Sequence, residues 1–528
     1  MLSKATSYAQ LREQFAWSIP QRYNIGWDIC DKWADSDPER LALILDEENR
    51  SVSFGELRVL SNRLANLLAA RGVVPGDRVG VLLPQQLETA VAHIAALKLG
   101  AITIPLFTLF GEEALGHRLS DAEAKAVITD DEGASKITTM RAELPSLQTI
   151  LNVDDGLSKA MSAMSDDFTP LDTSSEDPAI LIYTSGTTGK PKGALHAQRV
   201  LLGHLPGVEM SHDLFPQVGD KIWTPADWAW IGGLLDVLMP ALHHGVPVVV
   251  GRFAKFTGEA AFELMAKHQV RNAFLPPTAL KIMRGVSNPP TLNLRTVGSG
   301  GESLGEELLD WGRQTLGVTI NEFYGQTECN MIVSSCQHLN LQRSGVMGWG
   351  VPGHEVAVLD EDAKPVTEAE GRIAVKRGSP VMFLGYWNND AATAEKFDED
   401  WLITGDRGIE ESDGGIRFVG RDDDIISSAG YRIGPGEIED CLLKHDAVSL
   451  AAAVGKPDSL RGEIVKAYIV LTKGAAPSQE LAEEISAFVK TRLAAHEYPR
   501  EVSFVEALPM TTTGKIIRRE LREKARHE

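Results

Sequence analysis

The sequence has few cysteines and no excess of basic residues. Its four cysteines are scattered among 528 residues and form no CxxC pair, which argues against a disulfide framework and suits a reducing compartment. Asp and Glu outnumber Lys and Arg by 73 to 52, so the net charge is −21. Proteins that bind nucleic acid or a membrane surface need basic patches. We therefore expect no nucleic-acid partner.

Apolar runs long enough to span a bilayer are also missing, and the first 30 residues lack the continuous apolar segment of a signal peptide. No histidine pair has the HExxH spacing of a zinc enzyme. The content of 43% hydrophobic and 24% charged residues over 528 positions is that of a globular enzyme with two or more domains. We expect a cytoplasmic protein without a membrane span.

What the sequence does contain is a loop rich in glycine and hydroxyl groups. The run Tyr183-Thr-Ser-Gly-Thr-Thr-Gly-Lys-Pro-Lys-Gly193 follows an apolar segment. Close backbone N–H groups, hydroxyls and lysines are the groups that wrap a polyphosphate. The run is not a Walker A loop, because its glycines are too closely spaced and Pro191 follows the first lysine. The alternative is a flexible surface turn, the usual meaning of such clusters.

Further motifs follow in order. Residues 301–303 (Gly-Glu-Ser) come after a short apolar strand, where glycine lets the backbone pass flat against a planar base. The octamer 321–328 combines aromatic, hydroxyl, amide and carboxylate groups, which suit a nucleobase and a phosphate-bound Mg²⁺. Asp406 ends a strand, where a carboxylate can accept ribose hydroxyls. A charged run from Gly420 indicates a hinge, and a hydroxyl-rich turn presents Lys515. Alone, each could be an ordinary turn or surface residue.

In this order, the motifs resemble the signatures of the adenylate-forming superfamily, which includes acyl-CoA synthetases, firefly luciferase and the adenylation domains of peptide synthetases. The resemblance spans residues 25 to 525. It implies an AMP-forming acid–CoA ligase. A carboxylic acid attacks the α-phosphate of MgATP to give acyl-AMP and pyrophosphate, and the thiol of CoA then displaces AMP. ATP and CoA are implied as co-substrates, and Mg²⁺ as cofactor.

The expected fold is α/β. Alternating strands and helices over residues 57–128 predict a doubly wound parallel sheet with helices on both faces, and residues 346–381 predict a small β subdomain. We expect a large N-terminal domain, 1–420, and a small α+β C-terminal domain, 421–528. The resemblance implies that this second domain is mobile about a hinge at Asp423. A helix is predicted over 196–205 and a loop over 152–178.

The resemblance also implies roles for individual residues. Lys515 bridges the carboxylate and the α-phosphate as the catalytic lysine, with Glu328 and Thr187 also catalytic and holding Mg²⁺. The other predicted contacts to ATP or AMP are Thr184, Ser185, Gly186, Thr188, Gly189, Lys190, Lys192, Gly301, Glu302, Ser303, Glu322, Phe323, Tyr324, Gly325, Gln326, Thr327, Asp406, Arg421 and Arg432. Predicted contacts to CoA are Ala429, Gly430 and Tyr431, and Ala429 stands where acetyl-CoA synthetases have a serine.

The acyl pocket leaves the most alternatives open. Trp228, Trp230 and Gly232 are candidates for its wall, with ordinary core packing as an equal alternative. Gly325 stands where acetyl-CoA synthetases carry a tryptophan, which implies a deeper pocket and favours a medium-chain or branched fatty acid. Benzoate-like acids and short-chain acids are alternative substrates.

The thiol acceptor and the partners are predicted in the same way. The chain extends 13 residues past Lys515 (528 minus 515), too few for a fused carrier domain, so CoA is the expected thiol. A carrier-protein thiol and a non-catalytic nucleotide-binding paralogue are the alternatives. A homodimer, and a lysine acetyltransferase acting on Lys515, are further partners that the sequence leaves open.

Overall fold

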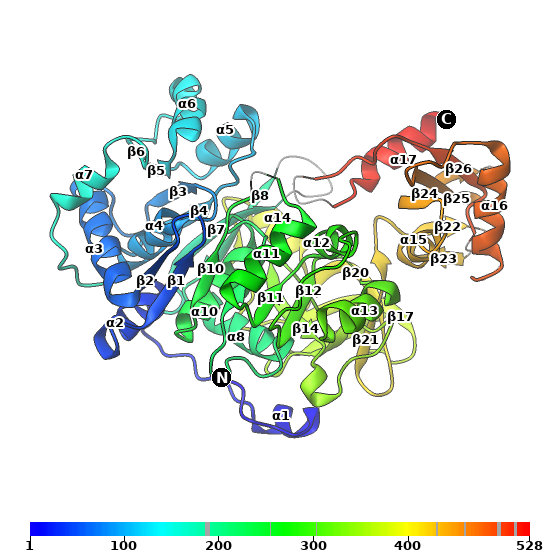
Figure 1. Ribbon diagram of the computed structural model, residues 1–528, viewed down its shortest axis with the longest axis horizontal. Helices are drawn as coiled ribbons and strands as arrows, with labels where there is room; N and C mark the ends of the chain where they lie inside the picture. The colour runs from blue at the N-terminus through cyan, green and yellow to red at the C-terminus, as the bar shows by residue number, and fades with distance from the viewer. Residues whose placement is uncertain are drawn as a thin grey trace. The chain divides into compact units, whose positions relative to one another are not determined.

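The computed structural model describes the whole chain except residues 185–190, 254, 303, 429–430, 459–460, 494–497 and 512–514, and no side chain at 427, 431, 432 or 437. The described chain forms two compact units. The larger unit comprises Met1–Val356 and Val375–Asp400, and the smaller unit comprises Ala357–Ala374 and Trp401–Glu528. Each unit has its own helices and strands (Figure 1).

One sheet of the larger unit has seven strands in the order β18-β8-β7-β4-β3-β5-β6. Its strands are β3 (Arg78–Leu82), β4 (Ile102–Pro105), β5 (Ala126–Thr129), β6 (Thr149–Asn152), β7 (Pro178–Thr184), β8 (Lys192–Ala197) and β18 (Gly385–Tyr386). The strands from β7 through β4, β3 and β5 to β6 are parallel, whereas β7 and β8 form an antiparallel hairpin. This arrangement confirms the predicted parallel sheet and adds a hairpin that carries the phosphate loop.

A second sheet in this unit runs in the order β15-β14-β13-β12-β11-β9-β10-β1-β2. Its strands are β1 (Leu41–Leu45), β2 (Arg50–Ser53), β9 (Ile222–Trp223), β10 (Val248–Val250), β11 (Asn272–Phe274), β12 (Thr296–Gly300), β13 (Ile320–Gln326), β14 (Cys329–Ser334) and β15 (Gly348–Gly350). The strands between β1 and β13 pair in parallel, and β13 turns back into β14 as a hairpin. The octamer 321–328 therefore lies along β13 and its turn.

Helices cover these sheets because their apolar residues recur every three or four positions. In α3 (Phe54–Ala70) the buried leucines include Leu57, Leu64 and Leu68, and the side chain of Ser53 caps the first turn. The other helices of this unit are α1 (Tyr8–Gln14), α2 (Lys32–Ser36), α4 (Leu87–Lys98), α5 (Glu112–Asp121), α6 (Asp131–Thr139), α7 (Leu157–Ser162), α8 (Val200–Ser211), α9 (Ile231–Gly233), α10 (Met239–His243), α11 (Gly258–His268), α12 (Pro277–Arg284), α13 (Glu306–Trp311) and α14 (Asp390–Glu395).

Four further strands pair side by side in the order β16 (Val356–Leu359), β17 (Glu370–Lys376), β20 (Trp401–Glu410) and β21 (Gly415–Arg421). The smaller unit also holds a five-stranded sheet of β22 (Ile426–Ser428), β23 (Tyr431–Ile433), β24 (Val448–Asp458), β25 (Gly462–Leu471) and β26 (Glu501–Phe504). Its helices are α15 (Pro435–Leu442), α16 (Gln479–Lys490) and α17 (Arg518–His527). This mixture of α and β elements confirms the fold class expected for the C-terminal part of the chain.

Two predicted segments differ from the structure. His196 lies on strand β8 instead of in a helix, and the helix begins only at Val200. Gln198 and Arg199 separate the strand from the helix, but a six-residue strand is too short for its period alone to mark it as a strand. Within the predicted loop 152–178, the structure forms the short helix α7, which buries Leu157 and Met161.

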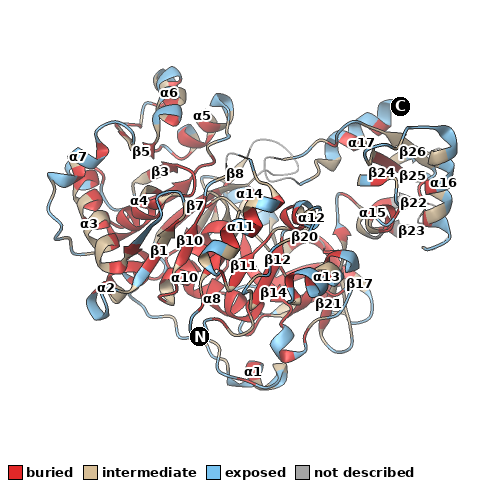
Figure 2. Cartoon of the chain, viewed as in Figure 1, coloured by how far each residue is buried: buried red, intermediate tan, exposed pale blue. Residues whose placement is uncertain are grey.

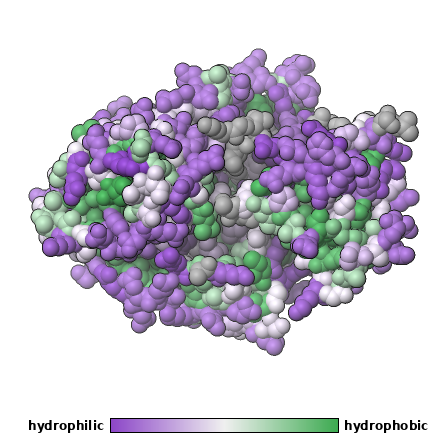
Figure 3. Space-filling view, turned by 90° about the horizontal axis from the view of Figure 1, so that it is seen from above, coloured by the Kyte–Doolittle hydropathy of each residue, from purple (hydrophilic) through white to green (hydrophobic). Residues whose placement is uncertain are grey.

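The buried residues are concentrated in the sheets. Figure 2 shows the strands of the larger unit mostly buried, with exposed residues concentrated on helices such as α6 and α7 and on the loops. Polar residues cover most of the face seen in Figure 3, and its apolar residues form separate patches. Among the described helices, none combines the length and the apolar character needed to cross a membrane.

Five buried histidines make the stability of the fold depend on pH. Burial lowers the pKa of each imidazole to about 3 or about 4, and they are His93, His196, His204, His212 and His354. In the unfolded chain the pKa is about 6.5. Below that pH the unfolded chain therefore binds more protons than the folded chain, so the free energy of unfolding falls as the pH falls.

We predict that urea unfolding at a series of pH values will give a steep loss of stability between pH 6.5 and 4. His93 lies on α4, and among the described contacts its Nδ1 has no hydrogen-bond partner. His93→Leu should make the pH dependence shallower by about 1 kcal/mol per pH unit, whereas His527→Gln, at the exposed C-terminal end, should leave it unchanged. If the free energy of unfolding changed with pH as steeply in the His93→Leu protein as in the unmodified protein, this explanation would be contradicted.

Candidate active site

The hairpin of β7 and β8 holds the two ends of the phosphate loop side by side. Thr184 at the end of β7 pairs with Lys192 at the start of β8. Next to this pair, Nε2 of His117 lies 3.0 Å from the carbonyl oxygen of Pro191, and the Tyr183 hydroxyl donates to Asp121 at 2.7 Å. The predicted contacts Ser185, Gly186, Thr187, Thr188, Gly189 and Lys190 lie outside the described residues, and their roles stay predictions.

Tyr386 connects this hairpin to the turn that carries Glu328. It lies on β18, which pairs with β8, and its hydroxyl donates to the carboxylate of the buried Glu328. The ammonium of Lys192 lies 5.2 Å from the centre of the Tyr386 ring. Burial, together with the charge of Glu328, raises the pKa of Tyr386, so that it remains a neutral donor.

Sequence reasoning missed Tyr386, although a Gly385-Tyr386-Trp387 run in a polar region was a visible signal. The indole N–H of Trp387 donates to the carbonyl oxygen of Asp121 at 3.1 Å. The backbone N–H of Trp387 donates to the carbonyl oxygen of Gly193 at 2.7 Å. The run is therefore bound to the phosphate hairpin by main-chain and side-chain contacts. The sequence alone does not indicate which distant strand β18 pairs with.

The carboxylate of Glu328 suits a hard cation because it is buried and bonded to Tyr386, on the strand next to the loop hairpin. Among the described residues, no three histidine, cysteine or acidic side chains gather into a metal site. A single buried carboxylate such as that of Glu328 suits Mg²⁺, which is commonly held by one or two carboxylates and takes its other ligands from phosphate oxygens and water.

The residues predicted to meet the base lie along β12 and β13. The Glu322 carboxylate accepts from the backbone N–H of Leu304 at 3.3 Å, which links the two segments. Tyr324 is partly exposed, whereas Phe323 is 6% exposed and its ring centre lies 5.2 Å from that of Phe274. Successive side chains on a strand point to opposite faces. The Phe323 side chain therefore packs in the core, and its predicted contact with the nucleotide stays a prediction.

The remaining members of this region occupy the ends of the two strands. Gly301 follows β12 with a φ of +98°, a conformation that favours glycine, and Glu302 next to it is partly exposed. Gln326 accepts from the ammonium of Lys396 at 2.9 Å, and Thr327 is partly exposed in the hairpin turn. Ser303 lies outside the described residues.

In the smaller unit, the residues predicted to hold ribose lie on adjacent strands. Asp406 on β20 pairs in register with Arg421 on β21, and their charged groups are 3.7 Å apart. Arg421 also donates to Asp423 at 3.1 Å. Burial alone would lower the pKa of Arg421, but the two carboxylates hold it above its ordinary value.

Lys515 lies in a short turn before α17. Its backbone N–H donates to the Thr511 hydroxyl at 3.1 Å, the Thr511 N–H donates back to its carbonyl oxygen at 2.7 Å, and its side chain is exposed. Arg518 and Arg522 on α17 pair with Asp424, which anchors this end of the chain next to the predicted hinge. Ala429 and Gly430 lie outside the described residues, as do the side chains of Tyr431 and Arg432.

Two of the residues predicted for the acyl pocket are closely packed in the structure. Trp228 is 0% exposed within the main core of the larger unit, so core packing, the alternative, describes it. A Cβ atom on Gly325 would lie 2.4 Å from Oδ1 of Asn330. Asn330 therefore lies close beside Gly325, and the effect of this glycine on the depth of the acyl pocket stays a prediction. Trp230 is partly exposed, 6.2 Å from the Phe107 ring, and Gly232 is also partly exposed.

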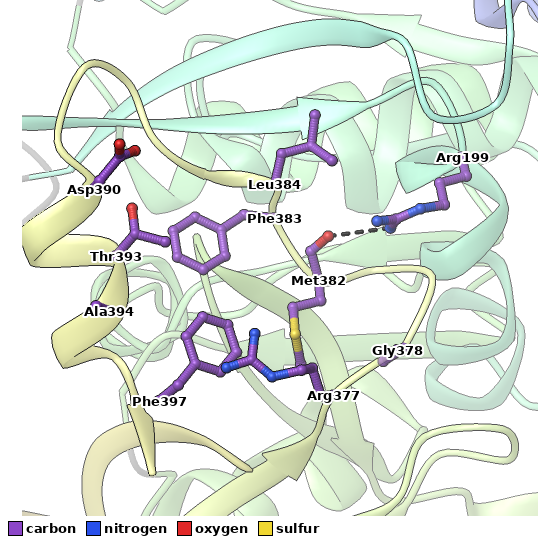
Figure 4. A pocket seen from close by; sticks show the side chains of 11 residues that line it. Arg199, Arg377, Gly378, Met382, Phe383, Leu384, Asp390, Thr393, Ala394 and Phe397 are labelled. Carbon is purple, nitrogen blue, oxygen red and sulfur yellow. Dashed lines mark hydrogen bonds between the residues drawn. The ribbon is translucent and has the colours of Figure 1, made fainter. Parts of the chain in front are cut away.

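A surface crevice of about 370 Å³ lies between α14 and the segment 377–384 (Figure 4). The guanidinium of Arg377 lies 3.6 Å from the centre of the Phe397 ring. Arg199, at another edge of the crevice, donates to the carbonyl oxygen of Met382 at 3.1 Å and pairs with Glu176. No residue predicted for the reaction lines this crevice, so we assign it no part in the chemistry.

The phosphate hairpin, the buried carboxylate and the exposed lysine are the features predicted for a nucleotide-dependent ligase, and comparison with known proteins agrees with this class. Residues 30–387 match the family described as AMP-binding enzyme, and residues 437–515 match the AMP-binding enzyme C-terminal domain. The chain belongs to this family of AMP-binding enzymes.

Individual relatives align along nearly the whole chain. Acetyl-coenzyme A synthetase of Bacillus subtilis is 33% identical over 95% of this chain and 90% of that protein. Acyl-coenzyme A synthetase ACSM3, mitochondrial, of Mus musculus is 32% identical over 98% and 93%. The structure of the anthranilate CoA ligase AuaEII with anthranoyl-AMP has a TM-score of 0.90 and 27% identity, covering 96% of this chain and 98% of that one. The prediction of an AMP-forming acyl-CoA synthetase is confirmed.

The contact between Tyr386 and Glu328 can be measured by a double-mutant cycle. A hydrogen bond to a charged, buried carboxylate contributes about 1.5–3 kcal/mol. We expect Tyr386→Phe and Glu328→Gln to show a coupling of about that size in the free energy of unfolding, measured in urea without nucleotide. Strictly additive effects would show that the two side chains do not stabilise each other.

Proposed function

We propose that the chain joins a medium-chain or branched aliphatic acid to CoA through an acyl-adenylate. In the first step a carboxylate oxygen attacks the α-phosphorus of ATP, and pyrophosphate leaves. In the second step the CoA thiolate attacks the acyl carbon, and AMP leaves. The observation that carries the proposal is the hairpin that places Lys192, Tyr386 and Glu328 next to the ends of the phosphate loop.

The first step brings two anions together, so it needs positive charge at the point of attack. Lys515 has an exposed ammonium group on a turn closed by Thr511, which suits a residue that enters a site for one step. In our proposal it contacts the carboxylate and the α-phosphate together. Thr327 would hold the α-phosphate, and Arg432 would contact phosphate in the same step.

The other groups would bind the remainder of the nucleotide. Asp406 and Arg421 form a carboxylate–guanidinium pair on adjacent strands that would take the ribose hydroxyls. Tyr324 would stack on the base. The other proposed contacts are Gly301, Glu302 and Ser303 for adenine, and Thr184, Ser185, Gly186, Thr187, Thr188, Gly189, Lys190 and Lys192 for the β- and γ-phosphates.

Glu328, with Thr187, would hold Mg²⁺. The bound ion supplies positive charge that neutralises the phosphate oxygens. Tyr386 keeps the Glu328 carboxylate oriented by donating to one of its oxygens.

We propose that the boundary between the two catalytic domains lies between residues 420 and 421, with Asp423 as the hinge. A change of backbone angles there would break the contact of Asp423 with Arg421, an exposed pair whose loss costs little. The second step would then present residues 429–431 to the pantetheine arm of CoA. Motion about a few residues in a charged linker is a common way to use one site for two reactions.

Medium-chain acids are favoured because Gly325 has no side chain at the position where the acetyl-CoA synthetases it resembles carry a tryptophan. An aryl acid is the second candidate, since the anthranilate CoA ligase has the high TM-score of 0.90. A cytoplasmic location fits the four buried, unbridged cysteines. Association into a homodimer is proposed only from the resemblance.

Pyrophosphate release with MgATP and CoA tests the proposed function across acetate, butyrate, hexanoate, octanoate, laurate and benzoate. We expect the highest kcat/KM between butyrate and octanoate, with a graded change because each methylene contributes about 0.8 kcal/mol, roughly fourfold. A maximum at benzoate would favour the aryl alternative. Release with none of the six, in the presence of MgATP and CoA, would count against the proposed reaction with these acids.

Lys515→Ala should separate the two steps. We expect acid-dependent pyrophosphate release to fall by roughly 10²-fold or more, while supplied acyl-AMP and CoA still give acyl-CoA. Homogeneous acetylation of Lys515 by a lysine acetyltransferase should have the same effect, because it removes the charge. Lys473→Ala, at another exposed lysine of this unit, is the control. Equal loss of both steps would contradict the role given to Lys515.

A further inference from the structure

One segment of the larger unit, residues 383–397, is bonded to both ends of the turn 326–328. At one end, the backbone N–H of Phe383 donates to the carbonyl oxygen of Glu328 at 2.9 Å, and the hydroxyl of Tyr386 donates to the carboxylate of the same residue. These contacts position the acidic end of the turn. The other end is bonded by a lysine that no motif of the sequence indicated.

This lysine is Lys396, and its partner is Gln326. Lys396 follows the last residue of α14, and its ammonium donates to Oε1 of Gln326, the last residue of β13, at 2.9 Å. An ammonium group only donates, whereas an amide has one accepting oxygen and one donating NH₂ group. The lysine therefore determines that the oxygen of the amide faces it. The donating Nε2 is then directed to the other side of the amide.

The backbone on both sides of Lys396 is held in place. Before it, the hydroxyl of Thr393 accepts from the backbone N–H of Tyr386 at 2.8 Å, and the N–H of Lys396 donates to the carbonyl oxygen of Thr393 at 3.1 Å. After it, the ring of Phe397 lies against the guanidinium of Arg377, 3.6 Å from the ring centre (Figure 4). A side chain carried by supported backbone can hold its partner in one geometry.

We propose that Lys396 is a positioning residue for the first step, because it holds the amide of Gln326 so that Nε2 donates to a non-bridging oxygen of the α-phosphate. The inference deepens the proposed acid–CoA ligase function and rests on it, since there the neighbouring Thr327 holds the same phosphate. Negative charge builds on these oxygens as the carboxylate attacks. A donor fixed in advance therefore stabilises the transition state more than it stabilises bound ATP.

The test measures kcat, and KM for ATP, in pyrophosphate release by the full-length enzyme with MgATP, CoA and the acid that gives the highest rate. We expect Lys396→Met to lower kcat by about tenfold, the effect of losing roughly one hydrogen bond to a charged group. KM for ATP should change by less than about threefold, because the contact matters most in the transition state. Lys396→Arg keeps a cationic donor and should recover part of the loss.

The matched control is Lys376→Met. Lys376 is an exposed lysine of the same unit, and its ammonium pairs with Glu355 at 2.9 Å. This substitution removes the same groups from a lysine that is not bonded to the turn 326–328. It should leave both kcat and KM for ATP unchanged.

Variants of Gln326 distinguish positioning from a merely structural contact. In a Gln326→Met background there is no amide to hold, so Lys396→Met should cause no further loss of kcat. Gln326→Glu places a carboxylate that pairs with Lys396, and thermal unfolding should show a protein as stable as the unmodified one. Its side chain cannot donate and repels phosphate, so kcat should still fall by about tenfold or more.

Three results would overturn the inference while leaving the ligase function in place. They are an unchanged kcat in Lys396→Met, equal losses from Lys396→Met with and without the Gln326 amide, and a fully active Gln326→Glu protein. If thermal unfolding shows that Lys396→Met does not fold, Gln326→Glu decides the question. Absence of pyrophosphate release by the unmodified enzyme with every acid would be a failure of the proposed function itself, and the inference would fall with it.

Discussion

The hydrogen bond from Tyr386 to Glu328 is the contact on which the described part of the site depends. It joins a strand of the phosphate hairpin's sheet to the turn between β13 and β14 in the other sheet. It acts together with the main-chain bond from the N–H of Phe383 to the carbonyl oxygen of Glu328 at 2.9 Å, which links the same two segments. A buried carboxylate also needs a donor, because an unpaired one is costly in a low-dielectric interior. The same contact thus satisfies the carboxylate and sets its direction.

The sequence predicted the family, the fold class and the order of the motifs because those depend on short local patterns. Apolar periodicity located α3, α4 and the parallel strands to within a few residues. The start of the helix predicted at His196 was wrong because β8 is short and its mostly buried residues do not show a clear strand period. These elements show that local patterns identify elements best where one face is polar.

The parts that could not be predicted are contacts between distant segments. Tyr386 meets Glu328 across 58 positions, and no spacing rule connects them. Trp228 looked like a pocket wall, but only the packing shows that it lies within the core. Gly325 suggested empty space, whereas Asn330, a residue further along the hairpin, lies close beside it. In each case the deciding fact is which side chain occupies a given volume.

The most direct test of the account follows the oxygen of the acid. Hexanoate labelled with ¹⁸O in its carboxyl group is converted with MgATP and CoA, and the products are analysed by mass spectrometry. Attack of the carboxylate on the α-phosphorus predicts that one ¹⁸O appears in AMP and none in pyrophosphate. Label in pyrophosphate or inorganic phosphate, or AMP that contains no label while acyl-CoA forms, would contradict an acyl-adenylate and with it the central claim.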